Sequence, residues 1–365
     1  MKKYLLSIAV LMAATISFTS CDDDDDCPTC PTPVIPRYGV YVINEGNYSY
    51  QINGTLDFLG YDVAKGTYSM TDSIFEKVNG RSLGGTPNDA LIFSDSLLCI
   101  AVADEDRVEF VNTTTKKASA AVSIDSPREL AYESGSNYLY VSSYTGKVYK
   151  IDMTTRTIAG ESEKVGANLE GIAVAGNKLY VCNSCNPDYT YNKNVVELNA
   201  NTLAKNQDIE VVDNPVDVIN AGSAIFILSM GNYADKPATV QMLKDGQLST
   251  IGNATMMAYN AYNDQLYMIN APFGGDKEYK VYNLKNGQTT TFLTNPDIFS
   301  PYSLTVNPVN GDVFITSSTK NPDTGYADYT ADCKLYRYTS AGILLGTYDC
   351  GVNPGTIVCD SYYQK

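Results

Sequence analysis

Short apolar segments recur along the chain from residue 38 onward, and each is bounded by Gly, Asn, Asp or Pro. Within these segments apolar and polar residues alternate, as in KVYKID and NVVELN, which is typical of half-buried β-strands. The apolar positions are rich in Val, Ile and Tyr, which favour strands. We find no amphipathic helix of substantial length in the sequence. The pattern therefore predicts an all-β protein.

One phrase, a turn followed by a short apolar strand and a polar break, occurs seven times. Its copies are centred on Tyr41, Cys99, Tyr140, Tyr180, Phe226, Tyr267 and Phe314. Successive centres are 58, 41, 40, 46, 41 and 47 residues apart, which is close to the period of a β-propeller blade. A short strand such as NPVDVIN usually precedes the phrase, and two further strands follow it. Seven units of four antiparallel strands predict a seven-bladed β-propeller.

The two ends of the repeat region complement each other. YGVYVIN, residues 38–44, begins directly at the second strand position of a blade. NPGTIVCD, residues 353–360, reads as an inner strand with no further unit after it. Pairing the two closes the ring without an open sheet edge at the seam. We therefore expect a single propeller domain over residues 38–365.

Residues 1–20 have the features of a lipoprotein signal peptide. Lys2 and Lys3 precede the apolar run YLLSIAVLMAATISF, which ends at small residues directly before Cys21. The alternative, a membrane-spanning anchor, is disfavoured because the run is shorter than the roughly 20 residues that a spanning helix needs. We predict that Cys21 is lipidated and that residues 21–37, an acidic tract and a Pro-rich stretch, form a linker.

Composition excludes several function classes. The chain has no His and no Trp, so catalysis by Ser-His-Asp or Cys-His groups is excluded, and most zinc sites are too. The formal net charge of −15 repels phosphate backbones and makes nucleic acid an unsuitable partner. No catalytic arrangement is recognisable, and we predict a binding protein instead of an enzyme.

The CxxC at Cys182 and Cys185 looks at first like a metal or redox motif. The repeat places it at the end of a strand and in the following loop, CNPDYTYNKN. The second CxxC, Cys27 and Cys30, lies in the linker, and no His can complete a zinc site. We therefore expect a local disulfide or two unreactive thiols. Cys333 and Cys350 flank one hairpin and are a further candidate pair, although the sequence does not fix the connectivity.

The loops between second and third strands should all emerge at one end of a propeller, where a rigid scaffold can present binding residues. Here these loops are long and rich in Tyr, Asn, Asp and Gly, a mixture suited to a large ligand with hydroxyl or amide groups. Turn formation and ordinary packing are the alternative explanation. The candidate ligand-binding residues, with two at the rim of the channel, are Tyr48, Tyr50, Arg128, Tyr144, Asn186, Asp188, Tyr189, Tyr191, Tyr233, Phe273, Tyr302, Tyr326 and Tyr329.

Several acidic residues are also placed to reach the channel mouth, namely Glu45, Asp104, Glu105, Asp106, Glu129, Glu170 and Asp217. The loop NPDTGYAD offers oxygen ligands of the kind that Ca²⁺ prefers, but it lacks the spacing of a known calcium loop. We expect no resident cofactor, with Ca²⁺ as the one open possibility.

The phrases LYVSSYTG with KVYKIDMTT, and LYVCNSCNP with NVVELNANT, resemble the YVTN-type propeller repeat family. The segment CDDDDD resembles the start of surface-exposed lipoproteins of Bacteroides-type bacteria. This second resemblance implies a protein anchored at the outer membrane through Cys21 and facing outward; a plain acidic spacer is the alternative.

The stretch VYVINEGNYSYQINGTLDFLGYDVAKGTYSMTD, with the blade at residues 170–200, is similar to BtuG-type corrinoid-capture propellers. That resemblance implies a protein that binds vitamin B12-like corrinoids and passes them to a TonB-dependent outer-membrane transporter. A glycan would suit Tyr- and Asn-rich loops equally well, and an adhesion or scaffold propeller that grips a protein is a third possibility.

Overall fold

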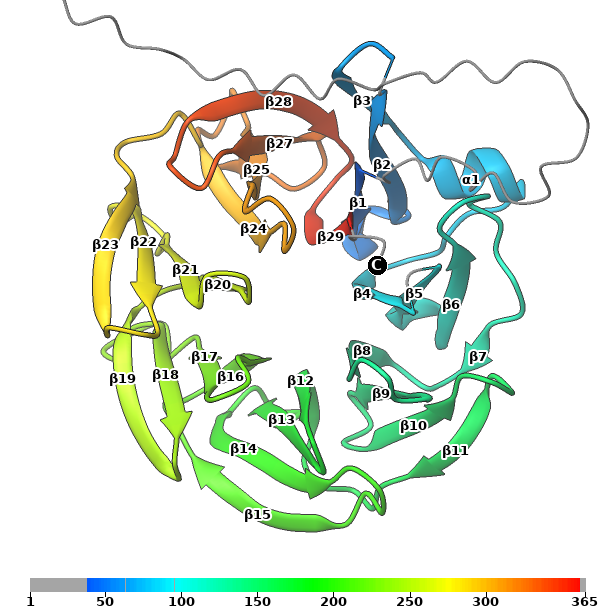
Figure 1. Cartoon of the computed structure of the whole chain (residues 1–365), viewed down its shortest axis with the longest axis vertical. Coiled ribbons are helices and arrows are strands. Elements are labelled where there is room, and N and C mark those ends of the chain that lie inside the picture. Colours follow the sequence, from blue (N-terminus) through cyan, green and yellow to red (C-terminus); the bar gives the residue numbers. More distant parts are fainter. Residues whose placement is uncertain (1–37, 63, 95, 362–365) are drawn as a thin grey trace, which may run out of the picture. The chain divides into compact units, whose positions relative to one another are not determined.

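The computed structural model describes residues 38–62, 64–94 and 96–361 and confirms the predicted seven-bladed β-propeller (Figure 1). Within these residues, helical turns are limited to α1 (Ile74–Asn79), η1 (Tyr48–Tyr50) and η2 (Ala103–Glu105). None of the helices described is long and apolar enough to cross a bilayer. The predicted signal peptide, Cys21 and the linker lie outside the described residues.

Each blade is an antiparallel sheet whose four strands run from the channel outward. From blade 1 to blade 7, the inner strands are β29 (Pro354–Ser361), β4 (Pro87–Phe93), β8 (Pro127–Tyr132), β12 (Asn168–Ala175), β16 (Pro215–Asn220), β20 (Met256–Asn260) and β24 (Ser300–Val306). The second strands are β1 (Tyr38–Asn44), β5 (Leu97–Val102), β9 (Tyr138–Ser143), β13 (Lys178–Cys185), β17 (Ile225–Ser229), β21 (Gln265–Asn270) and β25 (Val313–Lys320).

The third strands are β2 (Thr55–Asp62), β6 (Arg107–Asn112), β10 (Val148–Asp152), β14 (Tyr191–Asn199), β18 (Thr239–Lys244), β22 (Glu278–Asn283) and β27 (Cys333–Tyr338). The outer strands are β3 (Thr67–Thr71), β7 (Val122–Ser123), β11 (Thr157–Glu161), β15 (Lys205–Glu210), β19 (Gln247–Asn253), β23 (Gln288–Leu293) and β28 (Leu344–Cys350). Blade 7 has an additional short strand, β26 (Ala327–Asp328), which pairs with β25.

The ring closes as the sequence predicts, with the last strand pairing with the first. β29 runs antiparallel to β1, and Val42 faces Ile357 in the ladder. Beyond the ladder, the side-chain amide of Asn353 donates to the carbonyl of Gly46 at 2.7 Å. This contact joins the two ends of the repeat region at the end of the ring where the loops between second and third strands emerge.

Apolar side chains fill the seven borders between neighbouring blades. Strand β5 shows how the alternating sequence achieves this. Leu98 and Ile100 pack toward blade 1, whereas Cys99 and Ala101 pack toward blade 3. Because successive residues of a strand point to opposite faces, each blade contributes to two borders. The two-residue period in the sequence therefore encodes the packing of the ring.

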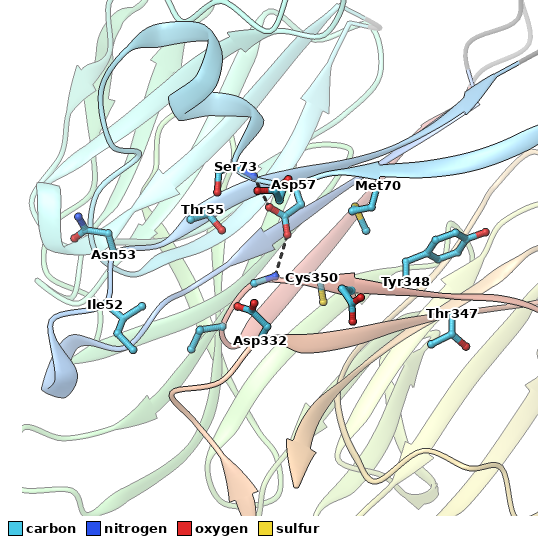
Figure 2. A pocket seen from close by; sticks show the side chains of 14 residues that line it. Ile52, Asn53, Thr55, Asp57, Met70, Ser73, Asp332, Thr347, Tyr348 and Cys350 are labelled. Atoms are coloured by element: carbon cyan, nitrogen blue, oxygen red, sulfur yellow. Dashed lines mark hydrogen bonds between the residues drawn. The ribbon is translucent and has the colours of Figure 1, made fainter. Parts of the chain in front are cut away.

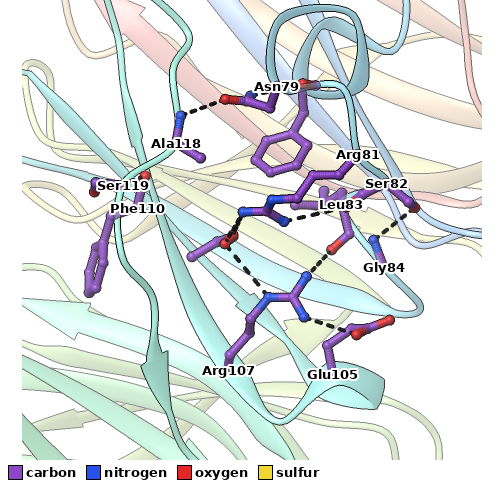
Figure 3. Close-up of polar contacts among 12 residues, drawn as sticks. Asn79, Arg81, Ser82, Leu83, Gly84, Glu105, Arg107, Phe110, Ala118 and Ser119 are labelled. Carbon is purple, nitrogen blue, oxygen red and sulfur yellow. Dashed lines mark hydrogen bonds and ion pairs between the residues drawn. The ribbon is translucent and has the colours of Figure 1, made fainter.

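The connection between blades 1 and 2 is held by a buried carboxylate that two arginines bind (Figure 3). Glu109, on β6, is almost fully buried and accepts two hydrogen bonds from Arg81, at 2.6 and 2.7 Å. Nε of Arg107 lies 3.6 Å from the same carboxylate, and Nη2 of Arg107 donates to the carbonyl of Leu83 at 2.9 Å. The guanidinium of Arg81 also stacks over the ring of Phe75, in α1. These contacts fasten the α1 segment to blade 2.

The structure corrects the expected position of the CxxC. Strand β13 continues through Cys185, and β14 already begins at Tyr191, so the loop is shorter than the sequence suggested. Cys182 and Cys185 are both free thiols. Three residues along a strand span about 10 Å, beyond the roughly 7 Å at which two Cα atoms can be bridged. Of the two expected outcomes, the local disulfide is wrong and the unpaired thiols are found.

Candidate functional site: an aromatic end above the channel

Large aromatic side chains are exposed at one end of the propeller. The loops between second and third strands leave the ring at this end because the strand order is the same in every blade. The exposed aromatic residues that these connections carry, which we call the aromatic end, are Tyr48, Tyr50, Tyr144, Tyr189, Tyr191, Tyr233, Phe273, Tyr326 and Tyr329. All nine are among the candidates that the sequence predicts.

Two contacts link aromatic residues of neighbouring blades. The rings of Tyr191 and Tyr233, from blades 4 and 5, have centroids 5.9 Å apart. The rings of Phe273 and Tyr326, from blades 6 and 7, are stacked with centroids 5.8 Å apart and planes inclined by 24°. Phe273 is 90% exposed and Tyr326 63%, so the stacked pair presents its aromatic surface to solvent. The aromatic end thus has at least two patches, one on each of two blade borders.

Asn186 and Asp188 serve the turn that presents Tyr189. The amide of Asn186 donates to the hydroxyl of Thr190 at 3.0 Å, and Asp188 accepts from the backbone N–H and the hydroxyl of Thr190 at 3.1 and 2.7 Å. These hydrogen bonds hold the pKa of the Asp188 carboxyl below its usual value. Tyr189 itself has a left-handed backbone, with φ of 63°, and its side chain is 79% exposed. Asn186 and Asp188 therefore both stabilise the turn through Thr190, and the side chain of Tyr189 is the exposed one.

Arg128 and Tyr144 meet at the rim of the channel. Nε of Arg128 donates to Glu170 at 3.0 Å, and Nη1 donates to the side-chain oxygen of Asn88 at 2.5 Å. The guanidinium lies over the ring of Tyr144, 4.3 Å from its centroid, while the Tyr144 hydroxyl donates to the other oxygen of Glu170. Arg128 thus connects the inner strands of blades 2, 3 and 4.

Tyr302 forms a second tyrosine–carboxylate pair at the rim, at the seam of the ring. Its hydroxyl donates to Oε2 of Glu45 at 2.9 Å. Burial raises the pKa of the Glu45 carboxyl to about 6, although the hydrogen bond from Tyr302 and the charge of Arg128 act in the opposite direction. The two rim candidates are therefore placed at the channel mouth, each bonded to a glutamate.

Three further carboxyls, those of Asp89, Glu129 and Asp217, lie on inner strands. Each of these residues is only partly exposed to solvent, and the burial of its carboxyl raises the pKa above the usual value in all three cases. Mutual repulsion adds to the effect, most clearly for Glu129, whose carboxyl is near both Asp89 and Asp217. Among the described residues, however, no three His, Cys, Asp or Glu side chains are grouped closely enough to hold a metal ion.

Sequence reasoning missed Asp89, although a signal for it is present. The triplets PND, PRE and PVD, at residues 87–89, 127–129 and 215–217, open three inner strands with Pro, a variable residue and an acid. At each triplet the pairing with the second strand shifts by a residue. Such a bulge re-aims the side chains that it contains. Asp104, Glu105 and Asp106, also expected near the channel mouth, bind Thr86, Arg107 and the backbone of Ser126, and Thr86 and Ser126 directly precede the inner strands β4 and β8.

A groove of about 680 Å³ lies between strands β2 and β3 of blade 1 and strand β28 of blade 7, and it was not expected from the sequence (Figure 2). One of the acids that line it is Asp57, which is almost fully buried. The carboxylate accepts hydrogen bonds from the backbone N–H groups of Ser73 and Gly351, at 2.8 and 2.9 Å, and from the side chain of Asn44 at 2.8 Å. With three donors bound, Asp57 links blade 1 to Gly351, which directly follows β28 of blade 7.

The fold is a seven-bladed β-propeller, an architecture compatible with binding a ligand or another protein. No protein-family model and no curated protein sequence matches the chain. Among solved structures, the chain is similar to hydrazine synthase of Kuenenia stuttgartiensis, with a TM-score of 0.58 and 16% identity, over 74% of this chain and 89% of the other. It is also similar to U3-55K, with a TM-score of 0.53 and 11% identity, over 73% and 81%. At these identities the likeness concerns the fold alone.

Proposed function

We propose that this protein is a lipid-anchored, cell-surface binding protein that captures a large ligand across its aromatic end and performs no catalysis. The observation that carries the proposal is the gathering of nine exposed aromatic side chains on connections at one end of a rigid ring. A fully exposed aromatic side chain can bury about 150–250 Å² on binding, at low conformational cost. Exposed apolar surface concentrated in this way is characteristic of interaction sites.

A corrinoid is the ligand class that we favour. Its macrocycle is broad and partly apolar and carries amide groups at its edge, so it can cover several tyrosines while the amides bond to polar loops. The resemblance of residues 40–72 to the corrinoid-capture propellers supports the same ligand, and it also suggests a TonB-dependent outer-membrane transporter as the partner. The signal-like residues 1–20 and Cys21 support anchoring at the outer membrane.

A glycan is the second candidate, because its hydroxyls and apolar ring faces also suit tyrosine surfaces. The two aromatic patches favour this possibility specifically, since separate stacking platforms can each hold one sugar ring. A protein partner is the third candidate.

Calorimetric titration of the full chain with cyanocobalamin, and with a panel of host and plant glycans, separates the three. Saturable binding of cyanocobalamin supports corrinoid capture, and binding of glycans alone supports the second candidate. Failure of both points to a protein partner and overturns small-ligand capture.

Two matched variants connect any binding to the aromatic end. Replacing Tyr191 and Tyr233 by Ala should weaken binding at least about tenfold, as is typical of aromatic hot spots. The control is Tyr262→Ala, because Tyr262 is 78% exposed but lies between the first and second strands of blade 6, at the opposite end of the ring. Equal losses in both variants would contradict the assignment of the site.

A further inference from the structure

Cys333 and Cys350 face each other on neighbouring strands of blade 7. Cys333 is the first residue of β27 and Cys350 the last residue of β28, and the antiparallel register pairs them directly. Residues opposed in this way point to the same face of the sheet, with Cβ atoms about 4.5–5.5 Å apart. A disulfide requires about 3.5–4.5 Å, so only a small adjustment separates the two arrangements. Both thiols are free here and belong to one apolar cluster.

We propose that Cys333 and Cys350 form a cross-strand disulfide when the chain folds under oxidising conditions. The ladder singles out this pair from the described cysteines. None of Cys99, Cys182, Cys185 and Cys359 has a cysteine opposite it in a ladder. The proposal depends only on this local geometry, and it stands or falls independently of the ligand.

The oxidant is a disulfide, either glutathione disulfide or a disulfide-carrier protein. The thiolate of one cysteine attacks a sulfur of that disulfide, forms a mixed disulfide and displaces one thiolate. The thiolate of the second cysteine then attacks the cysteine sulfur of the mixed disulfide, forms the Cys333–Cys350 bond and displaces the second thiolate. Two electrons pass to the oxidant, and the two protons from the cysteines end on the two released thiols.

The burial of the pair sets the order of events. In the folded ring Cys333 is fully buried and Cys350 nearly so, and burial raises the pKa of both thiols. Since the thiolate is the nucleophile, the folded dithiol reacts slowly. The bond therefore forms before blade 7 is packed against blade 1.

The cross-link has a consequence for the aromatic end. Cys333 directly follows the connection that carries Tyr326 and Tyr329, and the hydroxyl of Thr319 donates to the carbonyl of Asp332 at 2.5 Å. A bond from Cys333 to Cys350 would link the C-terminal end of the connection between β25 and β27 covalently to the outer strand β28. It thereby limits the ways in which the two tyrosines can move.

Peptide mapping tests the pairing. The full chain is refolded in a glutathione redox buffer, alkylated in denaturant and digested with trypsin without reduction. The expected product joins the peptides of residues 321–334 and 338–365. Because the second peptide also contains Cys359, the mapping is repeated with two variants. Cys359→Ala should keep the cross-link and Cys350→Ala should lose it. Alkylation of both thiols, or a cross-link that survives in Cys350→Ala, overturns the proposal.

Thermal unfolding provides a second measurement that does not depend on the yield of peptides. Adding dithiothreitol during unfolding should lower the Tm of the oxidised wild type by about 5 °C, as expected for opening a loop of this size in a domain of this length. The double variant Cys333→Ala/Cys350→Ala retains every other cysteine, so its Tm should not respond. An equal response of both proteins would show that the sensitive bond is elsewhere.

Discussion

The carboxyl group of Glu45 lies in the space that a side chain on residue 355 would need. A Cβ added to Gly355 would be 2.0 Å from Oε1 of Glu45. In two other blades the residue that directly follows the proline of the inner strand is Arg128 or Tyr302, and both extend to the rim. In β29 the residue after the proline is Gly355, which has no side chain. The carboxyl of Glu45, which directly follows β1, fills the space that a side chain there would take.

Gly355→Ala should therefore destabilise the ring. The new methyl group displaces the carboxyl of Glu45 and breaks its hydrogen bond from Tyr302, at a cost of about 1–3 kcal/mol in the free energy of unfolding. Urea denaturation measures the change. Gly252→Ala is the matched control, because no atom lies within 4 Å of its added Cβ. A wild-type midpoint for Gly355→Ala would show that Glu45 moves aside freely, contrary to this account.

The raised pKa of Glu45 predicts a pH dependence of stability. An acid with a higher pKa in the folded state is penalised once it ionises, so the contribution of Glu45 to stability is greatest below pH 4.5 and is lost as the pH rises through about 6. A difference of this size corresponds to about 2 kcal/mol. Glu45→Gln removes the titration and can still accept from Tyr302. In urea denaturation its advantage over wild type should be about 2 kcal/mol larger at pH 7.5 than at pH 4.5. An advantage that is the same at both pH values would contradict the cause assigned here.

The number of blades was predictable because strand alternation and turn residues are local properties of the chain. Tyr41, Tyr140 and Tyr267 each sit within a short apolar phrase, and the spacing of such phrases counts the blades directly. The aromatic end was predictable for the same reason, since connections such as that of Phe273 follow once the strand order is assumed. The number of blades and the position of the aromatic end could therefore both be predicted from local sequence pattern.

The hydrogen bonds among Arg128, Asn88 and Glu170 at the channel rim were harder to predict from the sequence, because they join different blades. Arg128 bonds to Asn88 and Glu170, residues 40 and 42 positions away in sequence, and the two contacts exist only after the ring closes. The direction of each side chain depends on the bulge after the inner-strand proline, which the alternation of residues does not reveal. Strand ends were also missed: β13 extends to Cys185 because its polar residues still have ladder partners.

Loss of the buried carboxylate at residue 109 should cost much more than loss of an exposed one. Glu109→Ala leaves Arg81 and Arg107 without their shared partner, and the free energy of unfolding should fall by about 1–3 kcal/mol, since Arg81 is partly exposed and Arg107 keeps its bond to Glu105. Glu210→Ala is the control, because its ion pair with Lys193 is exposed on both sides and is worth less than about 1 kcal/mol. Similar losses in the two variants, measured by urea denaturation, would show that Glu109 contributes no more than a surface charge.

The stacked pair Phe273 and Tyr326 tests whether one ligand covers both aromatic patches. The pair lies on the border of blades 6 and 7, whereas Tyr191 and Tyr233 lie on the border of blades 4 and 5, so only a broad ligand reaches both. Replacing Phe273 and Tyr326 by Ala should weaken cyanocobalamin binding about tenfold or more in calorimetry. The Tm should stay nearly unchanged because both rings are exposed. Binding that needs Tyr191 and Tyr233 but ignores this pair would instead indicate a smaller ligand held on one patch, which is the behaviour expected of a short glycan.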